Sequence, residues 1–245
     1  MTRHLSSVLI GCAGWSLSSK VAAEFPAVGT HLERYAAVFS TVEINSSFYR
    51  SHQAKTYARW RNSVPEDFRF SVKIPRTITH EHRLRETEHL LDQFLLEAGQ
   101  LEEKLECLLL QLPPSLKFST EEAADFFALL RGRTRMAVAC EPRHASWFSH
   151  EAEELMLEYA VSFVHADPPP VVDISRSAEP RTLYIRLHGA PEIYRSAYND
   201  DFLDAVAAKI MKARDQADRI FCIFDNTAEG AAIPDALSLI RRLAL

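Results

Sequence analysis

Five apolar runs of this chain end in pairs of polar side chains that stand two residues apart. The pairs are Glu43 with Asn45, Ser71 with Lys73, Glu141 with Arg143, His165 with Asp167, and Arg186 with His188. Residues two apart on a β-strand point to the same face, so each pair shares one side of its strand. Carboxylates, imidazoles and amines move protons in enzymes, and guanidinium groups bind anions. The spacing therefore predicts one shared site that binds an anion and transfers protons.

Three side chains are the candidates for catalysis. Glu141 and His188 are the candidate proton carriers, because histidine changes its charge near neutral pH and a carboxylate can act as general acid or base. Lys73 lies among apolar strand residues, where burial would lower the pKa of its amine and nearby carboxylates would raise it. As a site residue Lys73 would bind an anion, act as a base or form a Schiff base.

Further residues near the same strand ends are the candidates for substrate binding. They are Trp15, Glu43, Asn45, Tyr49, Gln111, Arg143, His144, Asp167, Arg186, Asp225 and Asn226. The two arginines would hold an anionic group through paired hydrogen bonds, and the acids and amides would orient the reacting groups. Aromatic side chains such as Trp15 and Tyr49 would wall the pocket or stack on a ring.

The same polar groups are also consistent with a purely structural ion-pair network, for example Lys73 with Glu43 or Glu141. A buried ion pair usually adds little stability compared with a hydrophobic replacement. Barrel interiors are otherwise filled by branched apolar side chains. A network of five polar pairs would therefore be a costly way to hold a fold, which favours a ligand or reaction site.

A divalent metal ion is the second alternative. Its ligands would come from Glu43, Glu141, His144, His165, Asp167, His188 and Asp225. No short metal-binding motif such as HExxH is present. The positive charges of Lys73, Arg143 and Arg186 would also repel the ion. We therefore expect no cofactor and keep a divalent metal as an alternative.

Eight apolar runs alternate with helical patterns along the chain, which is the count of a (β/α)8 barrel. The runs contain Val8, Val42, Phe70, Leu108, Ala137, Phe163, Leu183 and Ile220. In such a barrel the carboxyl ends of the strands form one shared site, and the polar pairs lie at that end of the runs. The alternate positions Val42, Ile44, Val72, Ile74, Ile185 and Leu187 are bulky and are expected to face the helices. We predict an α/β fold with a single TIM-type barrel of eight parallel strands.

Seven segments carry the apolar spacing of helices that bury one face. They are 31–39, 55–62, 90–105, 119–130, 150–160, 202–214 and 233–243. The crossover between the sixth and seventh strands, 168–180, is rich in proline and has no helical period, so we predict an irregular loop there. No linker or repeat divides the sequence, which favours one domain over residues 1–245.

Composition excludes some classes of partner. A net charge of −5 and a pI near 6.1 argue against a general binder of nucleic acid or anionic membrane. No apolar stretch approaches the ~20 residues that span a bilayer. The four cysteines fall in or beside predicted strands without CxxC spacing, so buried reduced thiols and a cytoplasmic location are expected. The short apolar segment Val8–Ile10 predicts a first barrel strand rather than a signal peptide.

Several segments resemble the YecE-like family, which is catalogued as domain of unknown function number 72. They are Gly11–Trp15, Thr41–Tyr49, Phe70–Arg76, Ile78–His80, Leu110–Ser115, Glu141–His144, Arg186–Gly189 and Asp225–Thr227. The resemblance covers essentially the whole chain in order. It implies a (β/α)8 barrel with its shared residues at the carboxyl ends of the strands, and it implies no established reaction. Asp225 stands where the family more usually has asparagine, which adds a negative charge to the site.

The favoured hypothesis is an enzyme, with hydrolase preferred over lyase and isomerase, that acts on a small anionic or polyhydroxylated substrate in the barrel mouth. The first alternative is a non-catalytic binding or sensing module that uses the same pocket. The second is a nucleic-acid processing protein, against which the net charge of −5 counts. We expect a small anionic molecule as partner and no membrane.

Overall fold

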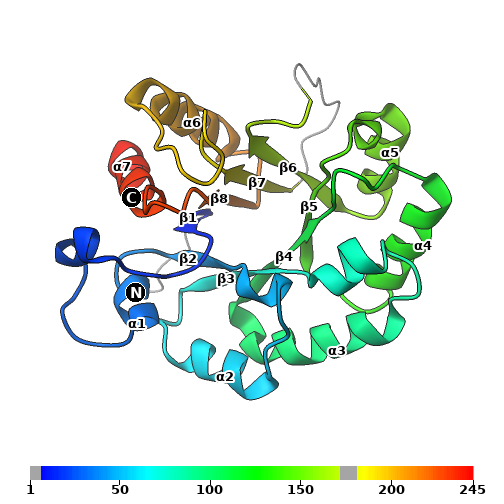
Figure 1. Ribbon diagram of the computed structural model, residues 1–245, viewed down its shortest axis with the longest axis horizontal. Helices are drawn as coiled ribbons and strands as arrows, with labels where there is room; N and C mark the ends of the chain where they lie inside the picture. Colours follow the sequence, from blue (N-terminus) through cyan, green and yellow to red (C-terminus); the bar gives the residue numbers. More distant parts are fainter. Residues whose placement is uncertain (1–6, 172–180, 245) are drawn as a thin grey trace.

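The computed structural model describes residues 7–171 and 181–244, and eight parallel strands form its centre (Figure 1). The strands are β1 (Val8–Cys12), β2 (Thr41–Ile44), β3 (Arg69–Lys73), β4 (Leu105–Gln111), β5 (Ala137–Glu141), β6 (Val161–Asp167), β7 (Thr182–Leu187) and β8 (Arg219–Phe224). From β2 to β8 each strand pairs with its neighbours in sequence, and β1 pairs with β8. The predicted TIM-type barrel of eight parallel strands is confirmed.

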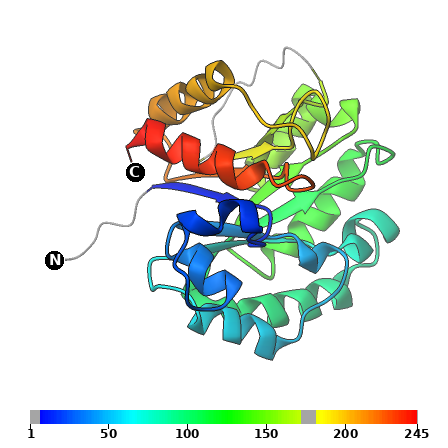
Figure 2. The ribbon, with the colours of Figure 1, turned by 60° about the vertical axis from the view of Figure 1, so that its left-hand side comes forward.

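Helices surround the strands and cover the outer face of the barrel (Figure 1). They are α1 (His31–Ala36), α2 (Ala54–Asn62), α3 (Glu88–Ala98), α4 (Thr120–Arg131), α5 (His150–Glu158), α6 (Asp200–Ala213) and α7 (Ala232–Leu243). Short helical turns occupy Ser19–Glu24, Ser46–Phe48, Thr77–Glu81, Gly99–Lys104 and Ala145–Phe148. Helices α6 and α7 lie side by side, and α7 covers β1 and β8 (Figure 2).

The seven predicted helices are present within the described residues, and two of them are clearly shorter than predicted. The helix predicted at 31–39 ends at Ala36. The predicted helix at 90–105 ends at Ala98, because Gly99–Lys104 continues as a tighter turn. Glu102 has a φ of 50° within that turn, so the chain does not return to an α-helix before β4. Residues 168–171 after β6 form no helix. The rest of the predicted irregular crossover, 172–180, lies outside the described residues.

Strands β1 and β2 close the barrel with little direct pairing. One parallel bridge joins Ala13 to Glu43, and the backbone N–H of Gly14 donates to the carbonyl of Glu43 at 3.0 Å. A Cβ at Gly11 would lie 2.1 Å from the carbonyl oxygen of Thr41. The two strands therefore approach so closely that only glycine fits at position 11.

The side chain of Tyr35 from α1 links the two strands below that bridge. Its hydroxyl accepts from the backbone N–H of Cys12 at 2.8 Å and donates to the carbonyl of Thr41 at 3.0 Å. The residue is fully buried. Buried backbone groups need partners, and this hydroxyl supplies one to each strand. Tyr35 thus takes the place of a direct backbone hydrogen bond at the closure of the barrel.

Replacing Tyr35 with phenylalanine is expected to lower the free energy of unfolding by about 1–3 kcal/mol, because a buried N–H and a buried C=O lose their partner together. Urea denaturation followed by circular dichroism measures the loss. Tyr159→Phe is the control, since the Tyr159 hydroxyl has no hydrogen bond to the described residues. Equal stability of the two variants would contradict the role assigned to Tyr35.

The alternation along the strands separates two apolar clusters. The inner cluster fills the barrel and consists of Leu9, Cys107, Leu109, Ala139, Val164, Tyr184, Phe221 and Ile223. The outer cluster packs strands against helices and includes Val42, Ile44, Val72, Ile74, Ile185 and Leu187, as predicted. In β2, β3, β5 and β7 the polar pairs take the inner parity, above the inner cluster.

The prediction for β6 is wrong, because His165 and Asp167 face away from the barrel axis. Val164 and Ala166 belong to the inner layer, so the residues between and after them point outward. His165 Nδ1 lies 2.7 Å from Nζ of Lys209 on α6, outside the barrel. The inner face of this strand therefore carries Val164 and Ala166 toward its carboxyl end, and no charged side chain.

No helix within residues 7–171 and 181–244 has the length and apolar character needed to cross a membrane. All four cysteines are buried and carry free thiols, as predicted from their positions in the strands.

Candidate functional site

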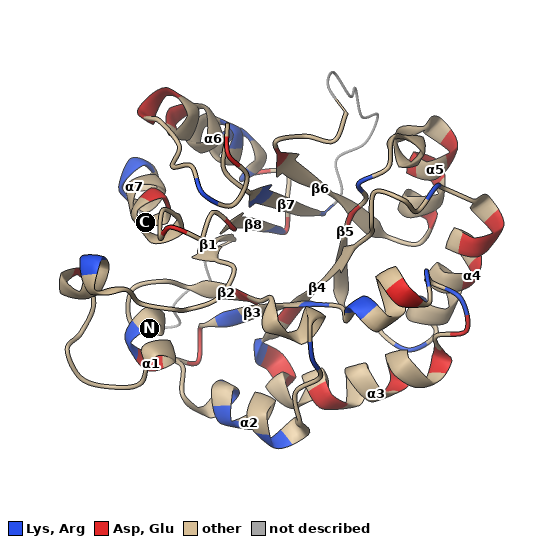
Figure 3. Cartoon of the chain, in the orientation of Figure 1, with Lys and Arg blue, Asp and Glu red and all other residues tan. Residues whose placement is uncertain are grey.

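Arg186 on β7 lies at the centre of a buried charged network. Its Nε and Nη2 donate to the two oxygens of Glu43 at 3.0 and 2.8 Å, a bidentate pair. Nη1 donates to Glu141 at 3.1 Å, and Nη2 lies 3.0 Å from Asp225. All four side chains are buried, and Figure 3 shows charged positions on the central strands as well as on the helices. Arg186 thus holds carboxylates from β2, β5 and the end of β8 together.

His188 lies one step further toward the carboxyl ends of the strands and joins the same carboxylates. Its Nδ1 lies 2.9 Å from Asp225, and its Nε2 lies 2.7 Å from Glu141. Nη2 of Arg143 lies 2.7 Å from Nε2 of His188 and 2.6 Å from Glu141. The Tyr194 ring packs edge-on against the imidazole, with 5.7 Å between centroids. Acid, base and guanidinium groups therefore meet around one imidazole.

The network keeps the carboxyl groups of Glu141 and Asp225 ionised. Burial alone would raise the pKa of Glu141 and of Asp225. The positive charge of Arg186 and the hydrogen bond from His188 outweigh burial, so both pKa values lie below the usual range. Glu141 is therefore an anion at neutral pH. This state suits an acceptor of hydrogen bonds and does not suit a proton donor.

Tyr184 is a member of the network that the sequence analysis missed. Its hydroxyl lies 2.9 Å from Glu43 and 2.9 Å from the hydroxyl of Ser71. Tyr184 stands two residues before Arg186 and four before His188, so it shares their parity on β7. The alternation that selected Arg186 and His188 therefore contained the signal for Tyr184 as well.

Lys73 ends β3 beside this network and does not pair with it. Its Nζ lies 3.9 Å from the centre of the Phe48 ring, a cation–π contact. The His80 ring packs edge-on against the same Phe48, with 4.9 Å between centroids. Burial is the largest cause that lowers the pKa of Lys73 to about 8, and the charge of Arg186 adds to it. The predicted pairing of Lys73 with Glu43 or Glu141 is absent among the hydrogen bonds and ion pairs of the described residues.

A cavity of about 480 Å³ opens between the loops that follow β1 and β8. Trp15, Lys20 and Thr227 are among its lining residues, together with Ala13 and Gly14. Gly14 is bonded through its backbone to Glu43, and the N–H of Ala13 donates to the carbonyl of Phe224 at 2.9 Å. The cavity therefore borders the strand ends that carry Glu43 and Asp225.

Several predicted binding residues lie near the strand ends without joining the network. The Nδ1 of His144 caps a short turn by accepting from the N–H of Ser146. The amide of Asn226 donates to the carbonyl of Ser196 and to Asp235. These contacts fix loops and give His144 and Asn226 structural roles.

Four other predicted binding residues also lie outside the charged network. Tyr49 is 68% exposed. Asn45 has a buried Oδ1 without a hydrogen-bond partner, and Gln111 is partly buried at the end of β4. Asp167 accepts from the hydroxyl of Tyr198 at 3.0 Å, away from the axis. Direct contact of these residues with a substrate stays a prediction.

Within residues 7–171 and 181–244, no group of three or more His, Cys, Asp and Glu side chains could hold a metal ion. The carboxylates that meet at the barrel mouth face the guanidinium of Arg186, where a cation would experience repulsion. The divalent-metal alternative therefore has no ligand set in this part of the chain.

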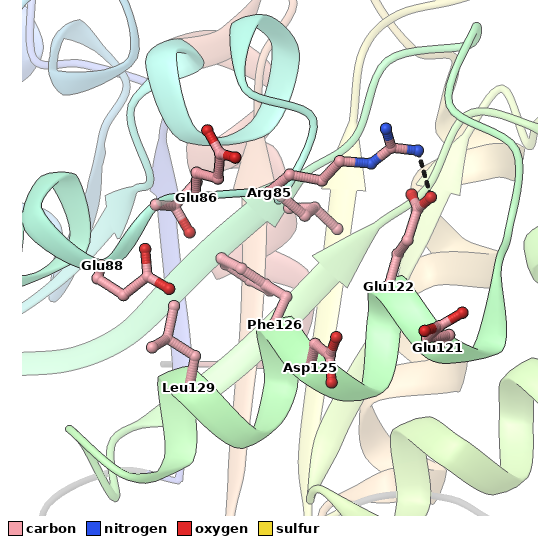
Figure 4. Close-up of a pocket in the computed structure, with 10 residues that line it drawn as sticks. Arg85, Glu86, Glu88, Glu121, Glu122, Asp125, Phe126 and Leu129 are labelled. Carbon is pink, nitrogen blue, oxygen red and sulfur yellow. Dashed lines mark hydrogen bonds and ion pairs between the residues drawn. The ribbon is translucent and has the colours of Figure 1, made fainter.

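A second cavity, also of about 480 Å³, lies between the segment before α3 and helix α4 (Figure 4). Its lining includes Glu86, Glu88, Glu121 and Asp125, and Arg85 pairs with Glu122 at its edge. This acidic groove lies among the outer helices, so it is separate from the charged network.

The sequence profile of the family described as "Protein of unknown function DUF72" matches residues 9–245. This chain belongs to the DUF72 family. Among similar DUF72 proteins, the UPF0759 protein YecE of Escherichia coli strain K12 is 33% identical over 165 residues, which are 64% of this chain and 58% of YecE. The match thus spans less than two thirds of the length of YecE. The UPF0759 protein YunF of Bacillus subtilis strain 168 is 24% identical over 268 residues, which cover 96% of this chain and 94% of YunF.

Solved structures of DUF72 proteins share the barrel. The crystal structure of a DUF72 family protein from Enterococcus faecalis V583 superposes with a TM-score of 0.83 at 23% identity, and covers 97% of this chain and 96% of that one. At this level of identity the likeness shows the fold. The expected membership and fold are therefore confirmed, and the chemistry of the site rests on its own geometry.

Proposed function

We propose that this chain is an enzyme that acts on a small anionic or polyhydroxylated molecule at the carboxyl ends of the barrel strands. One observation carries the proposal: His188 stands between the carboxylates of Asp225 and Glu141, with the guanidinium of Arg143 at its Nε2. A histidine oriented by a carboxylate is the common arrangement for moving protons. The carboxyl ends of barrel strands are where such groups act.

His188 is the proton carrier in this proposal. Asp225 lies 2.9 Å from Nδ1 and accepts its hydrogen, which fixes the orientation of the ring. Nε2 then faces Glu141 and Arg143, so its protonation changes the charge at the point where those two side chains meet. The imidazole is thereby held in one position, where it would exchange a proton with a bound ligand.

Arg143 is the anion-binding group. Its side chain is 18% exposed, and its Nε has no hydrogen-bond partner among the described residues. A buried guanidinium nitrogen without an acceptor is costly, and a carboxylate or phosphate of a bound ligand would satisfy it. Arg143 is thus better placed than Arg186, which is 1% exposed and already contacts three carboxylates.

Glu141 and Arg186 position the reacting groups in this scheme. Glu141 is ionised and accepts hydrogen bonds from both arginines, so we assign proton transfer to His188 and to the amine of Lys73. These proton carriers and anion-binding side chains suit a hydrolase, a lyase or an isomerase. We propose a hydrolase, which the sequence favours. The buried, reduced cysteines favour a cytoplasmic location.

The test is turnover of a panel of sugar phosphates, hydroxy acids and phosphate monoesters, followed by ¹H and ³¹P NMR. We expect the wild type to convert at least one member and His188→Gln to lose about 100-fold or more in rate, because proton transfer by a positioned side chain contributes on that order. Arg143→Gln is expected to raise the KM for the anionic substrate.

His150→Gln is the matched control, because His150 is an exposed histidine whose one ion pair among the described residues is with Glu154, across one turn of α5. Circular dichroism verifies that each variant is folded. If a ligand binds and is recovered unchanged, the protein is a non-catalytic binding module and the enzyme proposal is refuted. Equal rates in His188→Gln and His150→Gln would refute the proposed role of His188.

A further inference from the structure

Lys73 differs from the other charged groups at the barrel mouth because its amine has no counter-ion. Nζ contacts the face of Phe48 and makes no hydrogen bond or ion pair with the residues that the structure describes. The three carboxylates around it are engaged by Arg186. The residue is 4% exposed. A buried amine without a partner adds no stability to the fold, so its retention indicates a chemical role.

Lys104 shows what a structural buried lysine looks like in the same protein. Its Nζ donates to the carbonyls of Arg61 and Val64, both at 2.8 Å. The buried polar atoms that lack a partner in residues 7–171 and 181–244 do not include Nζ of Lys73. Since Nζ of Lys73 has no hydrogen-bond partner among these residues and is absent from that set, the amine is not completely shielded from solvent.

We propose that the amine of Lys73 is a nucleophile that forms an imine with a small aldehyde or ketone carrying a carboxylate or phosphate. The inference rests on the proposed function, since it names the reacting group of the substrate for the same site. An imine withdraws electrons from a neighbouring carbon–carbon bond, so this inference changes the preferred reaction class from hydrolase to lyase.

The step balances without an oxidant or a reductant. The nitrogen lone pair attacks the carbonyl carbon, a C–N bond forms, and a proton moves from nitrogen to the former carbonyl oxygen. The carbinolamine then loses its oxygen as water after protonation, which leaves a protonated imine on Lys73. Water reverses both steps and releases the product. His188 lies in the adjoining network and can carry the protons.

The surroundings of Lys73 favour the neutral amine that this attack requires. Burial and the charge of Arg186 bring the pKa of Lys73 to about 8, against the opposing effect of the carboxylates. At pH 7.5 about a quarter of the amine is then neutral, compared with about one in a thousand for an exposed lysine of ordinary pKa. Burial and the positive charge of Lys73 lower the pKa of His80, which packs on the same Phe48 ring. The lowered pKa of His80 keeps a second positive charge away from the amine of Lys73.

The experiment traps the imine by reduction. The full chain is incubated at pH 7.5 with glyoxylate, which carries an aldehyde and a carboxylate, in the presence of sodium cyanoborohydride. Intact mass and peptide mapping then locate the carboxymethyl group left on lysine. We expect one equivalent at Lys73, formed on the order of 100-fold faster than at exposed lysines such as Lys20.

Lys73→Arg is expected to lose the fast labelling, while Lys212→Arg, a change at an exposed lysine of α6, keeps it. The peptide map of the wild type decides the matter even where Lys73→Arg fails to fold. If the label is instead spread over the lysines according to their exposure, the imine proposal is wrong. If His188→Gln still abolishes turnover in that case, the proposed function stands without it. Rapid labelling of Lys73 in a protein that converts no panel member would support the reactive amine and remove the enzyme proposal.

Discussion

Arg186→Met is expected to lower the free energy of unfolding by about 3–5 kcal/mol, because it leaves buried carboxylates without their cation. Glu43 and Glu141 are each 1% exposed or less, and Arg186 contacts both of them as well as Asp225. For a chain of this size each kcal/mol shifts the melting temperature by about 2–4 °C. Differential scanning calorimetry at pH 7 should therefore register a drop of roughly 10 °C.

Arg242→Met is the matched control for that variant. Arg242 pairs with Asp200 and Asp204, which are 86% and 65% exposed, so the pair contributes at most about 1 kcal/mol. The double variant Glu43→Gln, Arg186→Met should recover part of the loss, since one uncompensated charge is removed. Similar melting temperatures for Arg186→Met and Arg242→Met would show that Arg186 does not hold the network together.

Strand β7 shows why much of the site could be predicted from sequence. Parallel strands of a closed barrel end at one rim, and every second residue faces the axis. Arg186 and His188 are polar at alternate positions between apolar neighbours, so parity alone placed them together. Glu43 and Glu141 followed from the same rule on other strands.

Strand β6 shows where the rule fails. The sequence contains polar residues at 165 and 167 and apolar residues at 164 and 166, and alternation does not say which set faces inward. Because the polar residues of other strands were expected to face inward, the same was expected of His165 and Asp167. In the structure Val164 joins the inner cluster and His165 reaches Lys209 on α6, so packing against the helix decided the face.

Which side chains of the network pair with one another could not be predicted from the sequence, because the pairing depends on side-chain geometry across the barrel. Lys73 has the right parity to pair with Glu43, and the longer fork of Arg186 reaches that carboxylate with two hydrogen bonds at once. The role of Tyr35 in closing the barrel depends likewise on a contact between a helix and two strands. Such contacts join residues that no local pattern relates.

Lys73→Met is expected to stabilise the protein at pH 7, since the charged amine is held in the native state at a cost. Each pKa unit corresponds to about 1.4 kcal/mol. A pKa of about 8 instead of 10.5 therefore means that the charged amine destabilises the native state by roughly 3 kcal/mol. The variant also loses the cation–π contact with Phe48, which offsets about 0.5–2 kcal/mol of that stabilisation. Urea denaturation should therefore give a free energy of unfolding about 1–3 kcal/mol higher for the variant.

The pH dependence separates this effect from a simple gain in packing. Between pH 8 and pH 10.5 the unfolded chain binds more protons at position 73 than the native protein does, so the stability contributed by this group rises with pH. The advantage of Lys73→Met over the wild type should thus be full below pH 8 and shrink toward pH 10.5. Groups common to both proteins cancel in the difference.

Lys104→Met is the control with the opposite expected sign, because it removes the donor to the carbonyls of Arg61 and Val64 and leaves both without that hydrogen bond. If Lys73→Met is instead the less stable protein at pH 7, its charge supports the fold and the structural-network alternative prevails. If it is more stable and the advantage fades with pH, the amine opposes the fold. A charge held against the stability of the barrel, at the rim where His188 and Arg143 meet, is then explained by chemistry at that amine.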